Sequence, residues 1–196
     1  MVKLLFQGHG SFRIITGDGT AVYVDPYAGE GYDMPADIIL STHEHFDHNQ
    51  ISKVVQKQDC RIIRSGEALK DGIYGSFSVK GVSIEAVPAY NKKHDRRECV
   101  GYMITADRIK IYAAGDTSRT EEMKEYAQAG IDYALLPTDG IYNMRPEEAA
   151  ECAVLIGAKH VIPVHMAPGK LFDEKAAERF VAPNRLIVKA GEEIVL

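Results

Sequence analysis

The stretch DIILSTHEHFDHNQ, Asp37 to Gln50, decides how this chain is interpreted, because an apolar run leads directly into a dense polar cluster. Three histidines and two acidic residues lie within six positions, and they are His43, Glu44, His45, Asp47 and His48. Side chains alternate along an extended segment, so His43 and His45 should point to the same side. Asp47 and His48 come after the chain turns and can face the same space. Imidazole and carboxylate together suit zinc, manganese or iron.

The cluster holds more donors than one closed tetrahedral metal site needs, and this surplus predicts a two-metal site. Further donors follow other apolar strands: Asp116 after IKIYAAG, His165 after VIPV, and Asn91 or His94 after EAVPAY. Strand ends that meet at one edge of a sheet sandwich would bring these side chains together, at a natural place for an active site.

Length and composition indicate an ordinary globular protein. The 196 residues fit one domain, 1–196, with 45% hydrophobic and 26% charged residues. A net charge of -5 argues against a nucleic-acid partner, and the absence of an apolar run of about 20 residues argues against a membrane. The first residues lack a signal-peptide cleavage site, and three scattered cysteines fit a reducing compartment, so we expect a cytoplasmic protein.

Strands precede helices in each half of the chain. Helical spacing or capping residues predict helices over residues 49–57, 66–72, 118–130, 145–157 and 173–181. The last segment, 185–196, is expected to close the chain as a paired strand. The order predicts an α/β fold of two sheets, each covered by helices on its outer face.

The segment THEHFDH matches the H-x-H-x-D-H signature of the metallo-β-lactamase superfamily. The segments GHGSFRI, VDPY, AAGDTS, LLPTDG and IPVHM follow the order seen in its small metal-dependent hydrolases, and the match covers nearly the whole chain. The chain resembles the ascorbate-6-phosphate lactonase-like branch. The resemblance implies a four-layer αβ/βα sandwich, two mixed sheets flanked by helices, with a binuclear site on its edge. It also implies two divalent metal ions, zinc first, with manganese or iron as alternatives.

The resemblance implies metal ligands at His43, His45, Asp47, His48, His94, Asp116 and His165. His43 and His45 should bind the first metal together with a third histidine. Family members place that histidine where this chain has Asn91, so we predict His94 and keep Asn91 as the alternative. Of the remaining ligands, Asp116 should bridge the metals and the others should bind the second.

Two metals with such ligands would share a water whose pKa falls to about 7, which provides a nucleophile at neutral pH. Asp47 is the predicted catalytic residue, since it could orient that nucleophile and carry a proton to the leaving group. The predicted reaction is hydrolysis of an ester, lactone or phosphoester bond. The alternatives are a phosphodiesterase acting on nucleotides or phospholipids, and a non-hydrolytic iron, redox or metal-binding module.

The substrate prediction rests on the segment NKKHDRR, whose Lys92, Lys93, Arg96 and Arg97 surround His94. Basic side chains beside a metal site favour a small anionic substrate, although such a loop can also be a solvated surface. Three more residues are candidates for the rim of the site or for support behind the ligands: His9, Asp139 and Tyr142. A homo-oligomer is compatible with the sequence.

Overall fold

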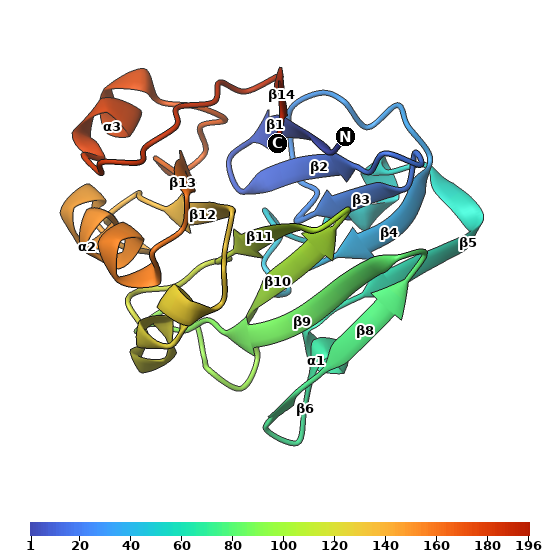
Figure 1. The fold of residues 1–196 in the computed structure, drawn as a ribbon, viewed down its shortest axis with the longest axis horizontal. Coiled ribbons are helices and arrows are strands. Elements are labelled where there is room, and N and C mark those ends of the chain that lie inside the picture. The colour runs from blue at the N-terminus through green and yellow to red at the C-terminus, as the bar shows by residue number, and fades with distance from the viewer.

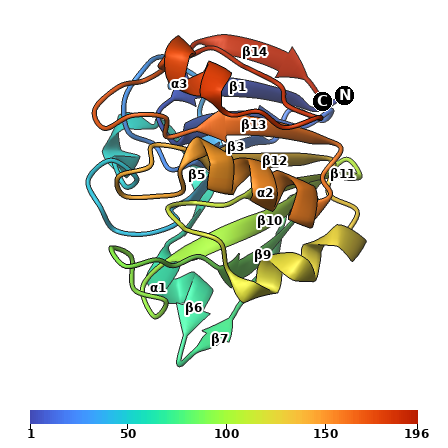
Figure 2. The ribbon, with the colours of Figure 1, turned by 90° about the vertical axis from the view of Figure 1, so that its left-hand side faces the viewer.

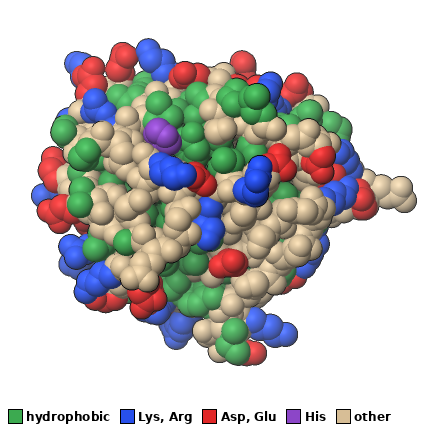
Figure 3. Space-filling view, viewed as in Figure 1, with side chains coloured by type: hydrophobic (Ala, Val, Ile, Leu, Met, Phe, Trp, Pro, Cys, Tyr) green, Lys and Arg blue, Asp and Glu red, His purple; other side chains and the backbone are tan.

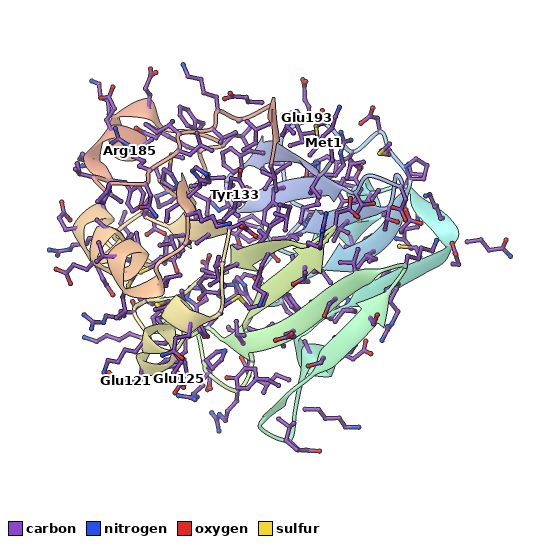
Figure 4. All side chains as sticks on the ribbon, in the orientation of Figure 1. Met1, Glu121, Glu125, Tyr133, Arg185 and Glu193 are labelled. Atoms are coloured by element: carbon purple, nitrogen blue, oxygen red, sulfur yellow. The ribbon has the colours of Figure 1, made fainter.

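The computed structural model describes residues 1–196 and contains two six-stranded sheets packed face to face (Figure 1). The first sheet has the order β14-β1-β2-β3-β4-β5. Its strands are β1 (Lys3–Gly8), β2 (Ser11–Ile15), β3 (Ala21–Val24), β4 (Ala36–Leu40), β5 (Gln56–Ile63) and β14 (Glu192–Val195). Figure 4 shows Met1 and Glu193 near each other, at the edge where β1 pairs with β14.

The second sheet has the order β13-β12-β11-β10-β9-β8. Its strands are β8 (Ser76–Val79), β9 (Val82–Pro88), β10 (Val100–Ala106), β11 (Ile109–Ala113), β12 (Tyr133–Pro137) and β13 (His160–Val164). A small hairpin of β6 (Leu69–Lys70) and β7 (Ile73–Tyr74) lies outside both sheets.

The main core lies between the sheets and comprises 28 buried apolar residues. The alternation of side chains along a strand explains how β9 contributes to this core, because Val82, Ile84 and Ala86 are buried and the residues between them are exposed. The central strands β3 and β4 are buried throughout, as their nearly continuous apolar sequences predict. The two-sheet architecture predicted from the sequence is therefore confirmed.

The helix α2 (Pro146–Ile156) covers the outer face of the second sheet, in front of β12 and β13 in Figure 2. Pro146 opens the helix and Gly157 ends it in the left-handed conformation, with φ of 66°. The helix α3 (Glu174–Arg179) starts after Asp173, whose side chain accepts a hydrogen bond from the Ala176 amide. Both helices lie where the sequence predicted them.

Three other predicted helices were wrong in type or extent. Within residues 118–130 there are two short 3-10 helices, η2 (Glu121–Lys124) and η3 (Tyr126–Gln128), in place of one α-helix. Within residues 66–72 the only helical part is the end of the one-turn helix α1 (Ser65–Ala68), because β6 begins directly after it. Residues 49–57 form only η1 (Ile51–Lys53), because β5 already pairs with β4 from Gln56 onward. Ile51 and Val54 still bury their side chains against the first sheet. This single turn therefore covers the part of the sheet's outer face that the longer helix was expected to cover.

The C-terminal segment also pairs less than expected. Only Glu192–Val195 forms a ladder with β1, and Arg185 makes an isolated bridge to Val161. On the face seen in Figure 3, basic and acidic side chains are interspersed around the rim. None of the helices is long and apolar enough to cross a membrane.

Strand direction determines where the polar loops gather. In the first sheet β1, β3 and β4 run the same way, and in the second β9, β11, β12 and β13 do. Every predicted metal ligand follows the carboxyl end of β4, β9, β11 or β13, so the pairing pattern of each sheet gathers its ligands at one end.

Candidate metal centre

Histidine and aspartate side chains from distant parts of the chain meet in two adjoining groups. The first group is His43, His45 and His94, and the second is His9, Asp47, His48 and His165. Within each group the ligand atoms lie within 4.8 Å of one another. These two groups hold six of the seven predicted ligands, from both sheets, together with His9. The seventh, Asp116, forms a third group with His43 and His48.

Asp116 lies between the two groups. Its Oδ2 is 3.2 Å from Nε2 of His94 and 3.4 Å from Nε2 of His165. Its Oδ1 is 3.3 Å from Nε2 of His48. The preceding Gly115 has φ of 64°, and a Cβ there would meet Thr42 at 2.9 Å, so only glycine lets the chain turn this closely. Asp116 is therefore placed where one carboxylate can contact both groups.

His48 is oriented by a buried carboxylate. Its Nδ1–H donates to Oδ2 of Asp25 at 2.8 Å, which directs Nε2 toward Asp116. Asp25 also accepts hydrogen bonds from the amide and the hydroxyl of Thr42, both at 2.7 Å. Because the Thr42 hydroxyl proton is used in this way, Nδ1–H of His43 donates to the same oxygen at 3.1 Å. Asp25 and Thr42 thus fix the rings of His43 and His48 together.

His94 and Asn91 occupy different positions relative to the cluster. Nδ1–H of His94 donates to Oδ1 of Asn91 at 3.0 Å, and Nε2 of His94 faces Asp116. The amide nitrogen of Asn91 donates to the carbonyl of Tyr142 at 2.9 Å. Asn91 therefore lies behind His94 and holds its ring.

Of the two roles considered for Asp139, the structure favours support behind the ligands over a place at the opening of the site. Its side chain is fully buried, and its Oδ2 lies 3.0 Å from Nδ1 of His165. Its Oδ1 accepts hydrogen bonds from the amides of Ile141 and Tyr142, both at 2.6 Å. The loop after β12 folds around this carboxylate, which places Asp139 behind His165 and leaves Tyr142 at the surface.

The pKa values reflect the crowding of charges. Burial and the neighbouring His48 lower the pKa of His43 to about 2. Burial opposes the charged form of His48, yet Asp116 and Asp25 outweigh it and raise the pKa of His48 to about 9. Burial would raise the pKa of Asp116, but His48 and His165 hold it well below its usual range. The environment therefore favours the ionised form of Asp116 and the protonated form of its neighbour His48.

The donor atoms fit a divalent metal. Nε2 of His48, Nε2 of His165 and Oδ1 of Asp116 are buried and have no hydrogen-bond partner. Buried polar atoms are normally satisfied, so such a cluster points to an ion as the missing partner. Imidazoles held at Nδ1 by an acceptor, with Nε2 free, are the usual arrangement of metal-binding histidines.

Two cavities adjoin the donors. One of about 430 Å³ opens over Asp47, His94 and His165, and its wall includes Lys93, Tyr142, Phe46 and Pro168. A more open one of about 850 Å³ lies beside His43 and His45, along residues 62–67 and 97–99. A small substrate could therefore reach both groups of donors from solvent.

Two of the four basic residues in the loop after β9 are paired with carboxylates, as in the solvated-surface interpretation of this segment. Arg97 pairs with Asp95 at 2.6 Å, while Arg96 pairs with Glu122 at 2.5 Å and lies over the ring of Tyr90. Lys93 alone among the four basic residues of this loop lines the cavity over the donors. The loop thus contributes one cation to this cavity.

Sequence reasoning missed Asp25 and Thr42 as parts of the site. Asp25 stands in the VDPY segment and Thr42 directly precedes His43, so both were visible as polar residues at strand ends. Their role became evident only from the hydrogen bonds that cross from β3 to the loop after β4.

The sandwich and its edge cluster of histidines and aspartates define a metallo-β-lactamase fold, and the profile of the beta-lactamase superfamily domain matches residues 3–165. The chain belongs to this superfamily and, within it, to the UPF0173 metal-dependent hydrolases. The relative from Thermococcus onnurineus is 30% identical over 226 residues, with all of both chains covered. That from Pyrococcus horikoshii is 31% identical over 228 residues, again with all of both chains covered.

Solved structures agree with this assignment. A Parabacteroides distasonis protein classed as a metal-dependent hydrolase is 30% identical, with a TM-score of 0.78 and coverage of 97% of this chain and 94% of that one. A metallo hydrolase from Ignicoccus hospitalis is 24% identical, with a TM-score of 0.76 and coverage of 98% and 97%, and shares the fold.

Proposed function

We propose that the protein uses a binuclear metal centre to hydrolyse an ester, lactone or phosphoester bond of a small anionic substrate. The observation that carries this proposal is the position of Asp116, whose two oxygens lie 3.2–3.4 Å from Nε2 of His48, His94 and His165. One carboxylate shared by two groups of donors is the arrangement that a bridged pair of ions needs.

Seven residues would hold the ions. His43, His45 and His94 serve the first position, Asp47, His48 and His165 serve the second, and Asp116 serves both. Three imidazoles with a carboxylate suit zinc, and the carboxylates also admit manganese or iron. The metals would supply a nucleophilic hydroxide at neutral pH and polarise the bond to be cleaved.

Asp47 is the proposed proton carrier of the reaction. It is only partly buried and borders the cavity over the donors, so it is the more exposed of the two carboxylates, Asp47 and Asp116, that line this cavity. Burial would raise the pKa of Asp47, but the contact with His9 and the charge of His48 hold this pKa below its usual range. An ionised Asp47 can accept the proton of the nucleophile and pass it to the leaving group.

The cavity supports the substrate class. Lys93 is the cation at its wall, which favours an anionic group, and the ring of Phe46, 67% exposed, offers an apolar surface beside it. About 430 Å³ accommodates a small molecule. The three free cysteines fit a cytoplasmic location, which we keep as part of the proposal.

The test begins with metal analysis of the purified protein, followed by turnover screening on lactones, phosphodiesters, thioesters and β-lactams. Two equivalents of zinc or manganese with turnover of one class support the proposal. Coloured iron without hydrolysis would instead support the redox alternative, and turnover of phosphodiesters alone would favour the phosphodiesterase.

The Asp47→Asn variant tests the proton-transfer role of Asp47 when its metal content is measured together with its turnover, because Asp47 is also a proposed ligand. We expect turnover to fall by roughly 100-fold or more with both metals still bound, since loss of a proton-transfer group costs roughly 10²–10⁴-fold. Glu44→Gln is the matched control, because Glu44 is an exposed acidic neighbour that pairs with Arg64. Equal turnover in both variants would remove Asp47 from the mechanism.

A further inference from the structure

His9 is held at the site by its backbone. It lies in the turn between β1 and β2 with φ of 59°, a conformation that residues other than glycine rarely adopt, and it is 1% exposed. Its amide donates to the carbonyl of Leu171 at 2.7 Å, and its own carbonyl accepts from the amide of His165 at 2.7 Å. The turn is thereby tied to the segment that carries a predicted metal ligand.

The imidazole of His9 presents a defined atom to the cluster. Its Nδ1 lies 3.2 Å from the carbonyl oxygen of Lys170. A carbonyl only accepts hydrogen bonds, so Nδ1 carries the proton. The other nitrogen, Nε2, lies 3.2 Å from Oδ2 of Asp47.

His9 differs from the orienting residues of the site in the atom that it contacts. Asp25 contacts His48 at Nδ1, and Asp139 contacts His165 at Nδ1, both on the side away from the cluster. His9 instead contacts Oδ2 of Asp47, and this same oxygen is the one that faces Nε2 of His165, at 3.9 Å.

We propose that Nε2 of His9 is a further metal donor at the second position, beside Asp47, His48 and His165. This inference rests on the binuclear centre proposed above. The four donor atoms lie within 4.8 Å of one another. The 3.2 Å between His9 and Asp47 fits the separation of about 2.8–3.4 Å expected for neighbouring donors with bonds of about 2.0–2.1 Å to one ion.

The consequence is an unequal pair of sites. The first position has three imidazoles and Asp116, a set of four that suits tetrahedral zinc. With His9 the second position has five protein donors including Asp116, which favours an ion of higher coordination number such as manganese or iron. The two positions should therefore differ in metal preference.

The direct test is NMR of the full chain loaded with an NMR-active cadmium isotope and carrying isotope-labelled histidine. We expect scalar coupling between cadmium and Nε2 of His9, with the resonance assigned by its loss in His9→Asn. Asparagine tolerates the left-handed backbone and can still donate to Lys170, so this variant should keep the fold. A proton retained on Nε2 of His9, with both metals bound, would overturn the inference.

A pair of variants provides the second readout. In His9→Gln the side-chain amide can still donate a hydrogen bond to Asp47 but is a poor metal ligand. In His9→Asn the shorter side chain provides neither a hydrogen-bond donor nor a metal ligand at the position of Nε2. We expect both variants to lose affinity for the second metal by at least tenfold, measured by chelator competition, with unchanged affinity for the first. Wild-type affinity in His9→Gln would show that His9 only clamps Asp47. Absence of bound metal in the wild type would instead refute the proposed function, so the two failures are distinguishable.

Discussion

The carboxylate of Asp25 accepts a hydrogen bond from Nδ1 of His48 at 2.8 Å, and both side chains are buried. The same carboxylate holds the amide and hydroxyl of Thr42, which in turn accepts from His43. One acidic residue, 18 positions before the first ligand of the histidine cluster (43 − 25), thus orients a ring in each group of donors.

Replacing this carboxylate by an amide should weaken the metal centre. In Asp25→Asn one oxygen acceptor becomes a donor, so either His48 or Thr42 loses its partner. We expect metal affinity to fall by roughly 10–100-fold, as for other partners behind metal ligands. We also expect the free energy of unfolding to fall by about 1–3 kcal/mol, because a buried polar group is left unpaired. Chelator competition and urea unfolding measure the two effects.

Asp33→Asn is the control, since Asp33 is exposed and pairs only with Arg13. Wild-type metal affinity in Asp25→Asn would show that the orientation of His48 does not depend on Asp25.

Metal binding should depend on pH through His48. In the metal-free protein Asp116 and Asp25 outweigh burial and raise the pKa of His48 to about 9, so at neutral pH its ring is protonated. A metal must displace that proton, so affinity should rise by about tenfold per pH unit below about 9 and level off above it. Calorimetry in buffers of different ionisation enthalpy measures the proton released. Binding without proton release at neutral pH would contradict this prediction.

Substrate preference should depend on Lys93 and not on its neighbour. Lys93 lines the cavity over the donors, whereas Lys92 is exposed and does not line it. We expect Lys93→Ala to raise KM for an anionic substrate by up to about fivefold, the effect of about 1 kcal/mol for an exposed charge pair, with kcat little changed. Lys92→Ala should leave KM unchanged. Equal effects of the two variants on KM would show that the overall charge of the loop, and not Lys93 in particular, attracts the anionic substrate.

Acid should destabilise the fold through Asp37, a buried residue at the start of β4, whereas the predicted metal ligands follow the other end of this strand. Burial would raise its pKa, but the Ala21 amide and the ammonium groups of Lys57 and Lys80 lower it from 3.8 to about 2. A lowered pKa in the folded state means that the stabilisation is complete above about pH 5 and is lost as the pH falls through about 2.

The shift corresponds to about 1–2 kcal/mol once solvent screening of the partly exposed lysines is considered. Asp37→Asn should remove this amount at pH 7 and flatten the acid transition, as measured by urea unfolding across pH. Asp59→Asn is the control, because Asp59 is exposed and shares only Lys80 with Asp37. An unchanged acid transition in Asp37→Asn would refute the assignment.

The sequence by itself determined the class of fold and which histidines and aspartates are candidate metal donors. Period-two apolar segments separated by glycine turns identify strands locally, because side-chain alternation is a property of the backbone. The spacing of His43, His45, Asp47 and His48 implies a metal-binding turn for a similarly local reason. The strong end signals of α2, Pro146 and Gly157, located that helix correctly.

Only the tertiary structure decided which polar residues work behind the ligands. Asp25, Thr42 and Asp139 orient histidines through contacts between segments far apart in the sequence, and no local pattern encodes such distances. The same holds for residues 49–57, where pairing of β5 with β4 overrode helical spacing. Local backbone geometry follows from the local sequence. Which polar residues come to orient the histidines depends instead on how the two sheets bring the strand ends together.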